Sequence, residues 1–246
     1  MSVRKIKLTI QYDGTAYHGW AAQPEMPTIQ GTLIDAIEKL TGCRVELVGS
    51  SRTDAGVHAS GQVAAFSINS PIPTENFTRA LNHLLPDDIA ITDAVEVPES
   101  FDPIRDTKSK LYRYTIYTGS ARPVMQIRYC WHRPGQLNIE AMQKAAEKLL
   151  GTHDFKSFAC AADNRQSSVR TIITCEIAGQ GEWITFDVQA DGFLYNMVRN
   201  IVGTLVEVGR GRWTAADIER ILAAQNRAEA GPIAPASGLC LMRIFY

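Results

Sequence analysis

Alternating strand and helix patterns follow one another along this chain in an order that restricts its fold more than any other feature. In the stretch 4–12, apolar side chains recur at every second position, which is the period of a β-strand. Thr28 then precedes a helical pattern that Gly42 closes. Later patterns in this half predict strands at 44–48 and 61–68, a helix at 74–84 and a strand at 89–97. The order β-α-β-β-α-β is that of a ferredoxin-like unit.

The second half repeats this order with insertions, although the halves share no visible sequence identity. Its patterns predict a strand at 110–117, a helix capped by Asn138 and ended by Gly151, strands at 169–177 and 183–189, an apolar helix at 194–208, a helix at 215–224 behind the capping box Thr214-x-x-Asp217, and a strand at 238–245. We therefore expect an α+β fold of two ferredoxin-like halves, residues 1–104 and 105–246. Two such halves commonly meet in a cleft, which is the natural place for a site.

Basic residues concentrate in one segment, although the whole chain carries a formal net charge of only −1. Between residues 104 and 135, seven lysines and arginines stand against one acid, Asp106, with tyrosines and a tryptophan among them. Cations neutralise phosphates and flat rings stack on bases, so the segment suggests contact with nucleic acid. A solvated strand face with buried tyrosines would produce the same pattern, and composition favours neither reading.

No segment predicts export, a membrane span or a metal site. The basic N-terminal residues are not followed by an apolar signal core. The longest apolar helical stretch, 201–208, contains Glu207 and is too short to cross a bilayer. Five cysteines without CxxC spacing and five histidines without HxH or HxxxH spacing indicate reduced thiols and suggest no metal. We expect a cytoplasmic protein.

The most unusual local feature is the polar loop Arg52-Thr53-Asp54-Ala55-Gly56 between two predicted strands. An aspartate in such a loop is more often an Asx-turn residue than a catalyst. A catalytic carboxylate would have to be held ionised by a cation or by several N–H donors close by. Other enzyme classes fit less well, because there is no G-x-S-x-G nucleophile elbow and no second acid to complete a glycosidase pair.

Arg199 is a candidate for that cation, because it lies inside the otherwise apolar run 193–203. A buried arginine needs a carboxylate partner, whereas a lone helix arginine more commonly extends its head to solvent. The residues alone leave both outcomes open. They describe an α+β protein with a basic stripe and one conspicuous aspartate.

Six segments occur in one order along nearly the whole chain. They are Tyr12-Asp13-Gly14-Thr15-Ala16-Tyr17-His18-Gly19-Trp20, Arg52-Thr53-Asp54-Ala55-Gly56-Val57-His58, Lys110-Leu111-Tyr112-Arg113-Tyr114, Asp154-Phe155-Lys156-Ser157-Phe158, the run 193–203, and Ala234-Pro235-Ala236-Ser237-Gly238-Leu239. Together they resemble the tRNA pseudouridine synthase A family. The resemblance makes a mere turn role for Asp54 improbable, because six ordered segments do not coincide by chance.

The resemblance implies a pseudouridine synthase fold, with two ferredoxin-like halves facing each other across a basic active-site cleft. It implies a homodimer in which each tRNA contacts both subunits. The implied substrates are uridines at positions 38, 39 and 40 of the tRNA anticodon stem-loop, which are isomerised to pseudouridine. No metal, nucleotide or organic cofactor is implied.

Two residues match the family's catalytic positions. Asp54 matches the essential carboxylate, which must be ionised, and Arg199 matches the arginine that pairs with it and lowers its pKa. Sequence does not decide whether the carboxylate attacks the ribose, attacks the base or removes a proton.

Four further residues are expected to bind the substrate. Arg52 matches the residue that fills the space left by the flipped base, whose extrusion costs about a few kcal/mol. Tyr112 matches the tyrosine packed on the target uracil, where stacking contributes about 1–3 kcal/mol. Lys110 and Arg113 belong to the basic segment 105–133, which would hold phosphates and make affinity salt-sensitive.

The chain also departs from the family pattern at several positions. Ser51 stands where glycine is usual, and Ala21 where glutamine is frequent. Ile104 and Ala159 stand where arginines are common, which puts individual contacts to the tRNA backbone in doubt. The alternative function is a non-catalytic tRNA-binding or tRNA-folding protein on the same scaffold, which would have no need of the Asp54 carboxylate.

Overall fold

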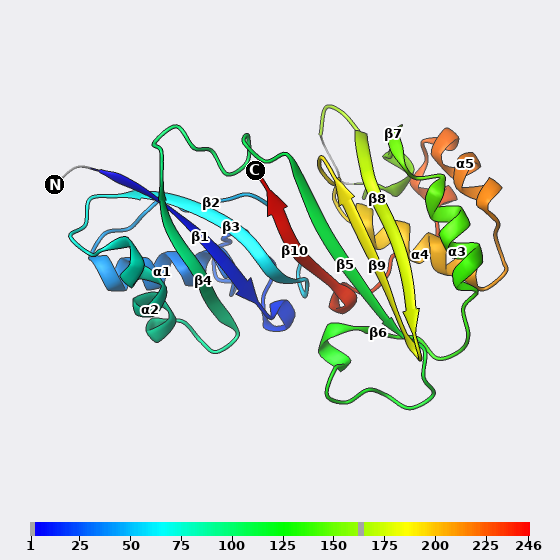
Figure 1. Ribbon diagram of the computed structural model, residues 1–246, viewed down its shortest axis with the longest axis horizontal. Coiled ribbons are helices and arrows are strands. Elements are labelled where there is room, and N and C mark those ends of the chain that lie inside the picture. Colours follow the sequence, from blue (N-terminus) through cyan, green and yellow to red (C-terminus); the bar gives the residue numbers. More distant parts are fainter. Residues whose placement is uncertain (1–2, 162–164) are drawn as a thin grey trace. The chain divides into compact units, whose positions relative to one another are not determined.

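The computed structural model describes residues 3–161 and 165–246, which form two compact units. The first unit runs to Lys108 and includes Leu241–Tyr246, and the second is Ser109–Cys240. Each unit combines strands and helices, and the chain thus has the α+β class that its patterns predict (Figure 1).

The first unit has the predicted order β-α-β-β-α-β. Its elements are β1 (Arg4–Tyr12), α1 (Ile29–Thr41), β2 (Val48–Gly49), β3 (His58–Ile68), α2 (Thr74–Leu84) and β4 (Ile89–Val97). In the sheet, β1 lies between β4 and β3 and pairs antiparallel with both, and β2 pairs with β3. The expected ferredoxin-like order of this half is therefore confirmed.

Burial in the first unit follows the periodicity of its strands and helices. Ile6, Leu8 and Ile10 of β1 are fully buried, and the residues between them are more exposed. The ring of Phe66 in β3 meets that of Phe77 in α2 edge-on, with centroids 6.0 Å apart. Burying each such side chain contributes about 1.5–3 kcal/mol, so this layer between sheet and helices accounts for much of the unit's stability.

The ends of α1 are those that the sequence predicts. The Thr28 hydroxyl accepts a hydrogen bond from the Gly31 N–H, and Gly42 closes the helix with a φ of 74°. The side chain at the first end satisfies an amide that has no partner within the helix. The left-handed backbone at the second end is one that glycine adopts without strain.

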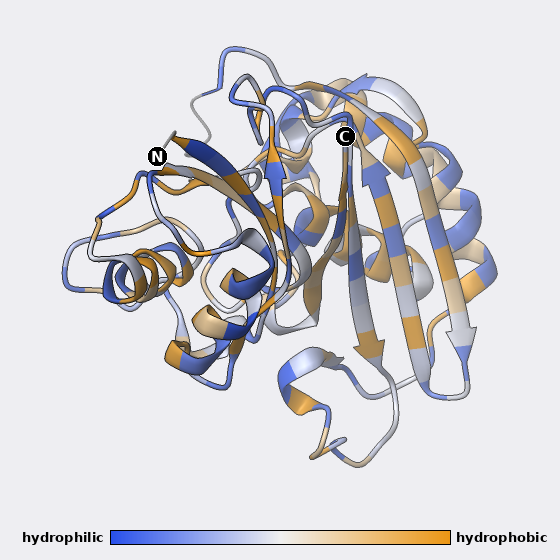
Figure 2. Ribbon diagram, turned by 60° about the vertical axis from the view of Figure 1, so that its left-hand side comes forward, coloured by the Kyte–Doolittle hydropathy of each residue, from blue (hydrophilic) through white to orange (hydrophobic). Residues whose placement is uncertain are grey.

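The second unit also has the expected succession of elements, with two short strands added. Its elements are β5 (Ser109–Tyr117), β6 (Trp131–His132), α3 (Ile139–Glu147), β7 (Gly151–Asp154), β8 (Val169–Gln180), β9 (Trp183–Ala190), α4 (Met197–Gly209), α5 (Ala215–Ala224) and the start of β10 (Leu239–Phe245). The antiparallel order is β5-β9-β8-β7, and β6 pairs parallel with β5. Hydrophilic and hydrophobic residues alternate along these strands (Figure 2).

Three local expectations differ from the structure. Residues 44–47 form no strand, and the Leu47 carbonyl accepts a hydrogen bond from the Gln30 side chain (2.7 Å). The apolar helix begins at Met197 rather than at 194, because Asn196 has a left-handed backbone with φ of 63°. The four-residue strand β7 begins at Gly151, where the sequence pattern predicts only the end of a helix.

The last residues of the chain contact the connection that precedes β5. The Phe101 and Tyr246 rings lie 5.1 Å apart, and the Lys108 N–H donates to the Phe245 carbonyl at 2.8 Å. These contacts group 105–108 and 241–246 with the first unit, whereas the expected halves were 1–104 and 105–246. The expected halves were two continuous stretches of sequence. They therefore could not include residues 241–246 in the first unit.

Within the described part of the chain, no helix combines the length and the apolar character needed to cross a membrane.

Candidate functional site

The loop that carries Asp54 connects β2 to β3 and is anchored on both sides of that residue. Asp54 is half-buried and Arg52 is exposed, but Thr53 between them is buried. The Thr53 hydroxyl lies 2.8 Å from the Tyr12 hydroxyl, and its carbonyl accepts the Trp20 N–H at 3.0 Å. Thr53 therefore fixes the backbone beside Asp54.

The segment from Tyr12 to Trp20 packs against this loop more closely than side chains would allow. A β-carbon on Gly14 would lie 2.0 Å from the Val57 carbonyl oxygen, and one on Gly19 would lie 2.6 Å from that of Thr53. Gly19 also has a φ of 91°, which favours glycine. The segments 12–20 and 52–58, which the sequence presents as separate motifs, thus pack against each other around Asp54.

Sequence reasoning missed Gln62, whose fully buried side chain holds the start of the same loop. Its Nε2 donates to the Ser51 carbonyl at 2.7 Å, and its Oε1 accepts from the amides of Ser51 (3.3 Å) and Val63 (3.1 Å). The side chain thus satisfies backbone groups where the irregular loop has no strand partner. The sequence feature that could have identified Gln62 is its polar side chain directly before the apolar run 63–66 of β3.

Replacing Gln62 with methionine should destabilise the first unit. The substitution keeps an unbranched chain of similar length but leaves the buried Ser51 amide and carbonyl without these partners, at a cost of about 1–3 kcal/mol. Urea unfolding followed by circular dichroism measures the loss. The matched control is Gln11→Met on the exposed face of β1, which should change the unfolding free energy by less than about 0.5 kcal/mol. Equal midpoints for the two variants would contradict the anchoring role.

His58, which ends the loop, is also held by the segment before α1. Its Nδ1 lies 3.1 Å from the Gly14 nitrogen and 3.1 Å from an Asp13 carboxylate oxygen. A neutral Nδ1 accepts the Gly14 N–H, whereas a protonated Nδ1 donates to Asp13. The His58 side chain therefore connects the end of the Asp54 loop to the segment before α1.

In the second unit, Tyr112 lies on the buried face of β5 beside Phe193. Its ring meets the Phe193 ring edge-on at 5.1 Å, and only 6% of its surface is exposed. The Phe193 carbonyl accepts from Arg165 Nη1 at 2.9 Å. Lys110 lies two residues earlier on the same face of β5, where burial, and then the charge of Arg165, lower its pKa to about 8. Lys110, Tyr112 and Phe193 therefore belong to one region of this unit.

Arg113 lies on the opposite face of β5 from Tyr112, because successive side chains of a strand alternate. Its guanidinium binds both carboxylate oxygens of Asp187 on β9, at 2.7 and 2.6 Å. This two-bond ion pair raises the pKa of Arg113. The structure thus gives Arg113 a partner within the sheet and separates it from the face that carries Lys110.

Arg199 lies in the first turn of α4 and its guanidinium is oriented by neighbours on both sides. Its Nε donates to the Ala234 carbonyl at 2.8 Å, and its Nη1 donates to the Asn196 side chain at 3.1 Å. The Ala234 amide in turn donates to the Arg199 carbonyl at 3.2 Å. The arginine therefore does not simply extend to solvent, and its direction is set by the turn at Asn196 and by the segment before β10.

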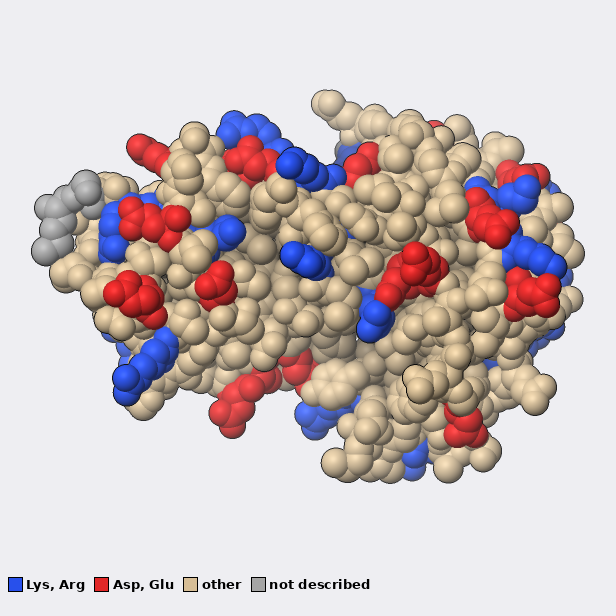
Figure 3. Space-filling model, viewed as in Figure 1, with Lys and Arg blue, Asp and Glu red and all other residues tan. Residues whose placement is uncertain are grey.

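The basic segment 104–135 is divided between the two units, and its aromatic residues differ in exposure. Tyr112 and Tyr114 are buried in the second unit, while Tyr129 is 48% exposed. The exposed cations include Arg105, Lys108, Arg113, Arg122 and Arg128. On the face shown in Figure 3, basic side chains stand beside acidic ones in small groups. The reading as a strand face with buried tyrosines therefore holds for part of the segment.

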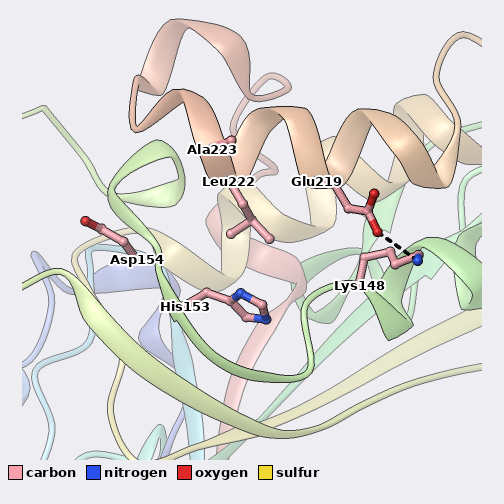
Figure 4. Close-up of a pocket in the computed structure, with 6 residues that line it drawn as sticks. All are labelled: Lys148, His153, Asp154, Glu219, Leu222 and Ala223. Atoms are coloured by element: carbon pink, nitrogen blue, oxygen red, sulfur yellow. Dashed lines mark ion pairs between the residues drawn. The ribbon is translucent and has the colours of Figure 1, made fainter.

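A pocket of about 360 Å³ lies in the second unit between β7 and α5, and none of the predicted site residues line it. Figure 4 shows the Lys148–Glu219 ion pair (2.8 Å) on one side and Asp154 pointing away from His153. The Asp154 carboxylate accepts from Ser168 Oγ and from the Gln225 side chain, and His153 Nε2 lies 2.8 Å from the Leu150 carbonyl. These groups join neighbouring elements and identify no ligand.

No group of three or more His, Cys, Asp or Glu side chains in residues 3–161 and 165–246 is arranged to hold a metal ion.

Comparisons with known proteins agree on one family. The model of a tRNA pseudouridine synthase family matches residues 8–104 and 145–246. The tRNA pseudouridine synthase A of Acetivibrio thermocellus is 46% identical over 244 residues, covering 99% of this chain and 100% of that protein. That of Moorella thermoacetica is 48% identical over 243 residues, covering 98% of this chain and 99% of that protein.

One solved structure, an H/ACA RNP bound to a substrate RNA containing 2'-deoxyuridine, aligns with 82% of this chain at 12% identity and a TM-score of 0.36. The chain spans 44% of that protein's length, and the likeness is too distant to support an inference.

Proposed function

The chain belongs to the tRNA pseudouridine synthase family, and on that premise we propose that Asp54 is its catalytic carboxylate and that it acts on the anticodon stem-loop. Its activity is that of an isomerase that converts uridine in tRNA to pseudouridine. The observation that carries the assignment of Asp54 is its setting: a half-buried carboxylate on a loop whose backbone is held by Thr53 and Gln62. A reacting group requires this kind of preorganised support.

The reaction breaks the bond between the ribose C1' and N1 of uracil, turns the base, and joins C1' to C5. The proton on C5 leaves, and N1 gains one, so the product is an isomer. In the proposed mechanism Asp54 acts in its ionised form at the glycosidic bond, and the Arg199 cation favours that form. The two contacts that orient the Arg199 guanidinium support this role, because they fix where its charge is directed.

The proposed substrate contacts use two residues that differ in exposure, since Tyr112 is buried and Arg52 is exposed. Tyr112 is held by Phe193 and would stack against the target uracil. Arg52 is exposed beside Asp54 and would enter the space that the extruded base leaves. Lys110 lies on the same face as Tyr112, which supports a role at the substrate. Arg113 is engaged with Asp187 on the other face, which supports a structural role better.

The finer assignment rests on the resemblance of six ordered segments to the tRNA pseudouridine synthase A family. It specifies uridines 38, 39 and 40, a homodimer in solution, and a cytoplasmic location where tRNA is processed. Sedimentation at several protein concentrations tests the dimer, and a monomer at all of them would contradict it.

Mapping pseudouridine in unmodified tRNA after incubation with the protein tests the proposed specificity. We expect modification confined to positions 38–40, and modification elsewhere would contradict the assignment of the anticodon arm. Tight binding without any modification would favour the non-catalytic tRNA-binding alternative. Transfer RNA that already carries pseudouridine at these positions is the matched control and should show no increase.

A further inference from the structure

Two arginines bind one buried acid where α4 ends, and a third arginine, Arg133, lies near enough for the charges to influence one another. Glu207 lies in the last turn of the helix and is 7% exposed. One of its carboxylate oxygens accepts from Arg210 Nη1 at 2.9 Å, and the other from Arg212 Nη1 at 2.8 Å. Burial opposes ionisation of Glu207, but the hydrogen bonds from Arg212 and Arg210 hold its pKa below the usual value. Both oxygens of the single acid are therefore already engaged.

Arg133 is the third arginine, and it comes from the segment that follows β6. The Asn138 N–H donates to the Gly209 carbonyl at 2.8 Å, which ties this segment to the end of α4. Burial, and then the charge of Arg210, lower the pKa of Arg133. In the part of the chain that the structure describes, no carboxylate lies within 4.0 Å of the Arg133 guanidinium. We call Arg133, Arg210 and Arg212 the α4 arginine cluster.

The backbone after α4 turns sharply and holds two members of the cluster near the same acid. The Gly211 N–H donates to the Val208 carbonyl at 2.8 Å, and the Arg212 N–H donates to the Glu207 carbonyl at 3.1 Å. Gly211 has a φ of 73°, a conformation that glycine adopts without strain. These bonds satisfy carbonyls at the helix end. The arginines are therefore presented by a fixed turn rather than by a loose loop.

The charges of the cluster do not balance. Three guanidinium groups and one carboxylate leave an excess of two positive charges. Burial is the larger reason why the pKa of Arg133 is lowered, and the charge of Arg210 adds to it. The negative end of the helix dipole favours nearby cations only modestly. Glu207 already binds Arg210 and Arg212, so its single negative charge leaves two positive charges of the cluster to be neutralised by another anion.

We propose that the α4 arginine cluster binds the phosphodiester backbone of the tRNA substrate, at a point separate from the reacting uridine; this inference rests on the proposed function. A guanidinium group offers five N–H donors in a planar fork that matches phosphate oxygens. Arg210 and Arg212 each donate one hydrogen bond to Glu207 through Nη1, and their other N–H groups are not used in these two bonds. Arg210, at the C-terminal end of α4, lies eleven positions after Arg199, which is about 16 Å along a helix.

The position of the cluster gives it a distinct part in substrate binding. A contact about 16 Å from Arg199 along a rigid helix cannot touch the same nucleotide, yet it keeps a fixed distance from it. The cluster would therefore help to set the register of the RNA, because phosphate contacts position a nucleic acid without reading its sequence.

Binding of an unmodified tRNA transcript, measured across a range of salt concentrations, tests the inference. For Arg210→Gln with Arg212→Gln we expect affinity at 0.1 M salt to fall about tenfold or more. The slope of log affinity against log salt should fall by about one to two. The matched control is Arg44→Gln with Arg220→Gln, which removes two exposed, paired arginines elsewhere.

A second variant separates RNA binding from structural damage, because the first one leaves Glu207 buried without its partners. Arg133→Gln leaves both ion pairs of Glu207 in place and should still weaken binding by about fivefold, with a slope lower by about one. The inference is overturned if Arg133→Gln and the double variant bind as the control does. Loss of unfolding stability without a change in affinity would likewise assign the cluster a structural role only. Pseudouridine formation by the unaltered protein, measured on the same transcript, tests the proposed function separately.

Discussion

Asp54→Asn should abolish pseudouridine formation while leaving tRNA binding within about twofold of the unaltered protein. The amide keeps the size and polarity of the side chain but removes the charge that the proposed mechanism requires. Loss of a group that attacks or transfers a proton reduces rates by at least about 10²–10⁴. Single-turnover kinetics on unmodified tRNA measure the effect.

The fold should tolerate this substitution. Asp54 is half-buried, and the hydrogen bond from the Val57 N–H to the Asp54 carbonyl (3.1 Å) is made by the backbone. The anchors at Thr53 and Gln62 do not involve the carboxylate. Asp93→Asn, on the exposed part of β4, is the matched control and should leave the rate unchanged. If Asp54→Asn retained full activity, the assignment of Asp54 would be wrong.

Arg199→Leu should slow the reaction by about 10²–10³, the cost of removing one preorganised electrostatic contact to a reacting group. Removing the cation also raises the pKa of a carboxylate that it stabilises. The rise of activity with pH should therefore move to higher pH, because the ionised form is reached later. A pH–rate profile at saturating tRNA measures both effects.

Asn196→Gly offers a milder test of the same arrangement. Glycine accepts the left-handed backbone at this position, so the turn before α4 is kept while the bond from Arg199 Nη1 to the side chain is lost. We expect a rate between those of the unaltered protein and Arg199→Leu, with a smaller pH shift in the same direction. Near-normal turnover of Arg199→Leu would remove the arginine from the reaction, and near-normal turnover of Asn196→Gly alone would remove only its positioning by Asn196.

Local sequence patterns predicted most of the secondary structure because each depends on neighbours only a few residues apart. The two-residue period of β1 and the signals at Thr28 and Gly42 correspond to the strand and the helix ends observed. The left-handed turn at Asn196 escaped prediction, because asparagine adopts that conformation only where its surroundings hold it. The spacing of apolar residues therefore predicted a helix from 194, whereas α4 begins at Met197.

The candidate site likewise has one part that the sequence predicted and another that only the structure shows. The polar loop around Asp54 and the arginine in an apolar helix were visible as unusual residue types, and the family resemblance gave them roles. The partners that hold them were not visible, because Gln62 binds Ser51 from 11 residues away and Ala234 binds Arg199 from 35 residues away. The alternation of side chains along a strand does predict that Arg113 and Tyr112 point to opposite faces of β5. Only the structure shows that Arg113 forms an ion pair with Asp187.

The sequence by itself determined the α+β class, the order of elements in each half and the family to which the chain belongs. Periodicity and caps report which face of an element is buried, and ordered motifs report ancestry. The tertiary structure decided which distant residues meet: the support of the Asp54 loop by residues 12–20, the return of 241–246 to the first unit, and the approach of Arg133 to the end of α4. Such contacts depend on how whole elements pack, because residues far apart in sequence become neighbours only when their surfaces are buried together.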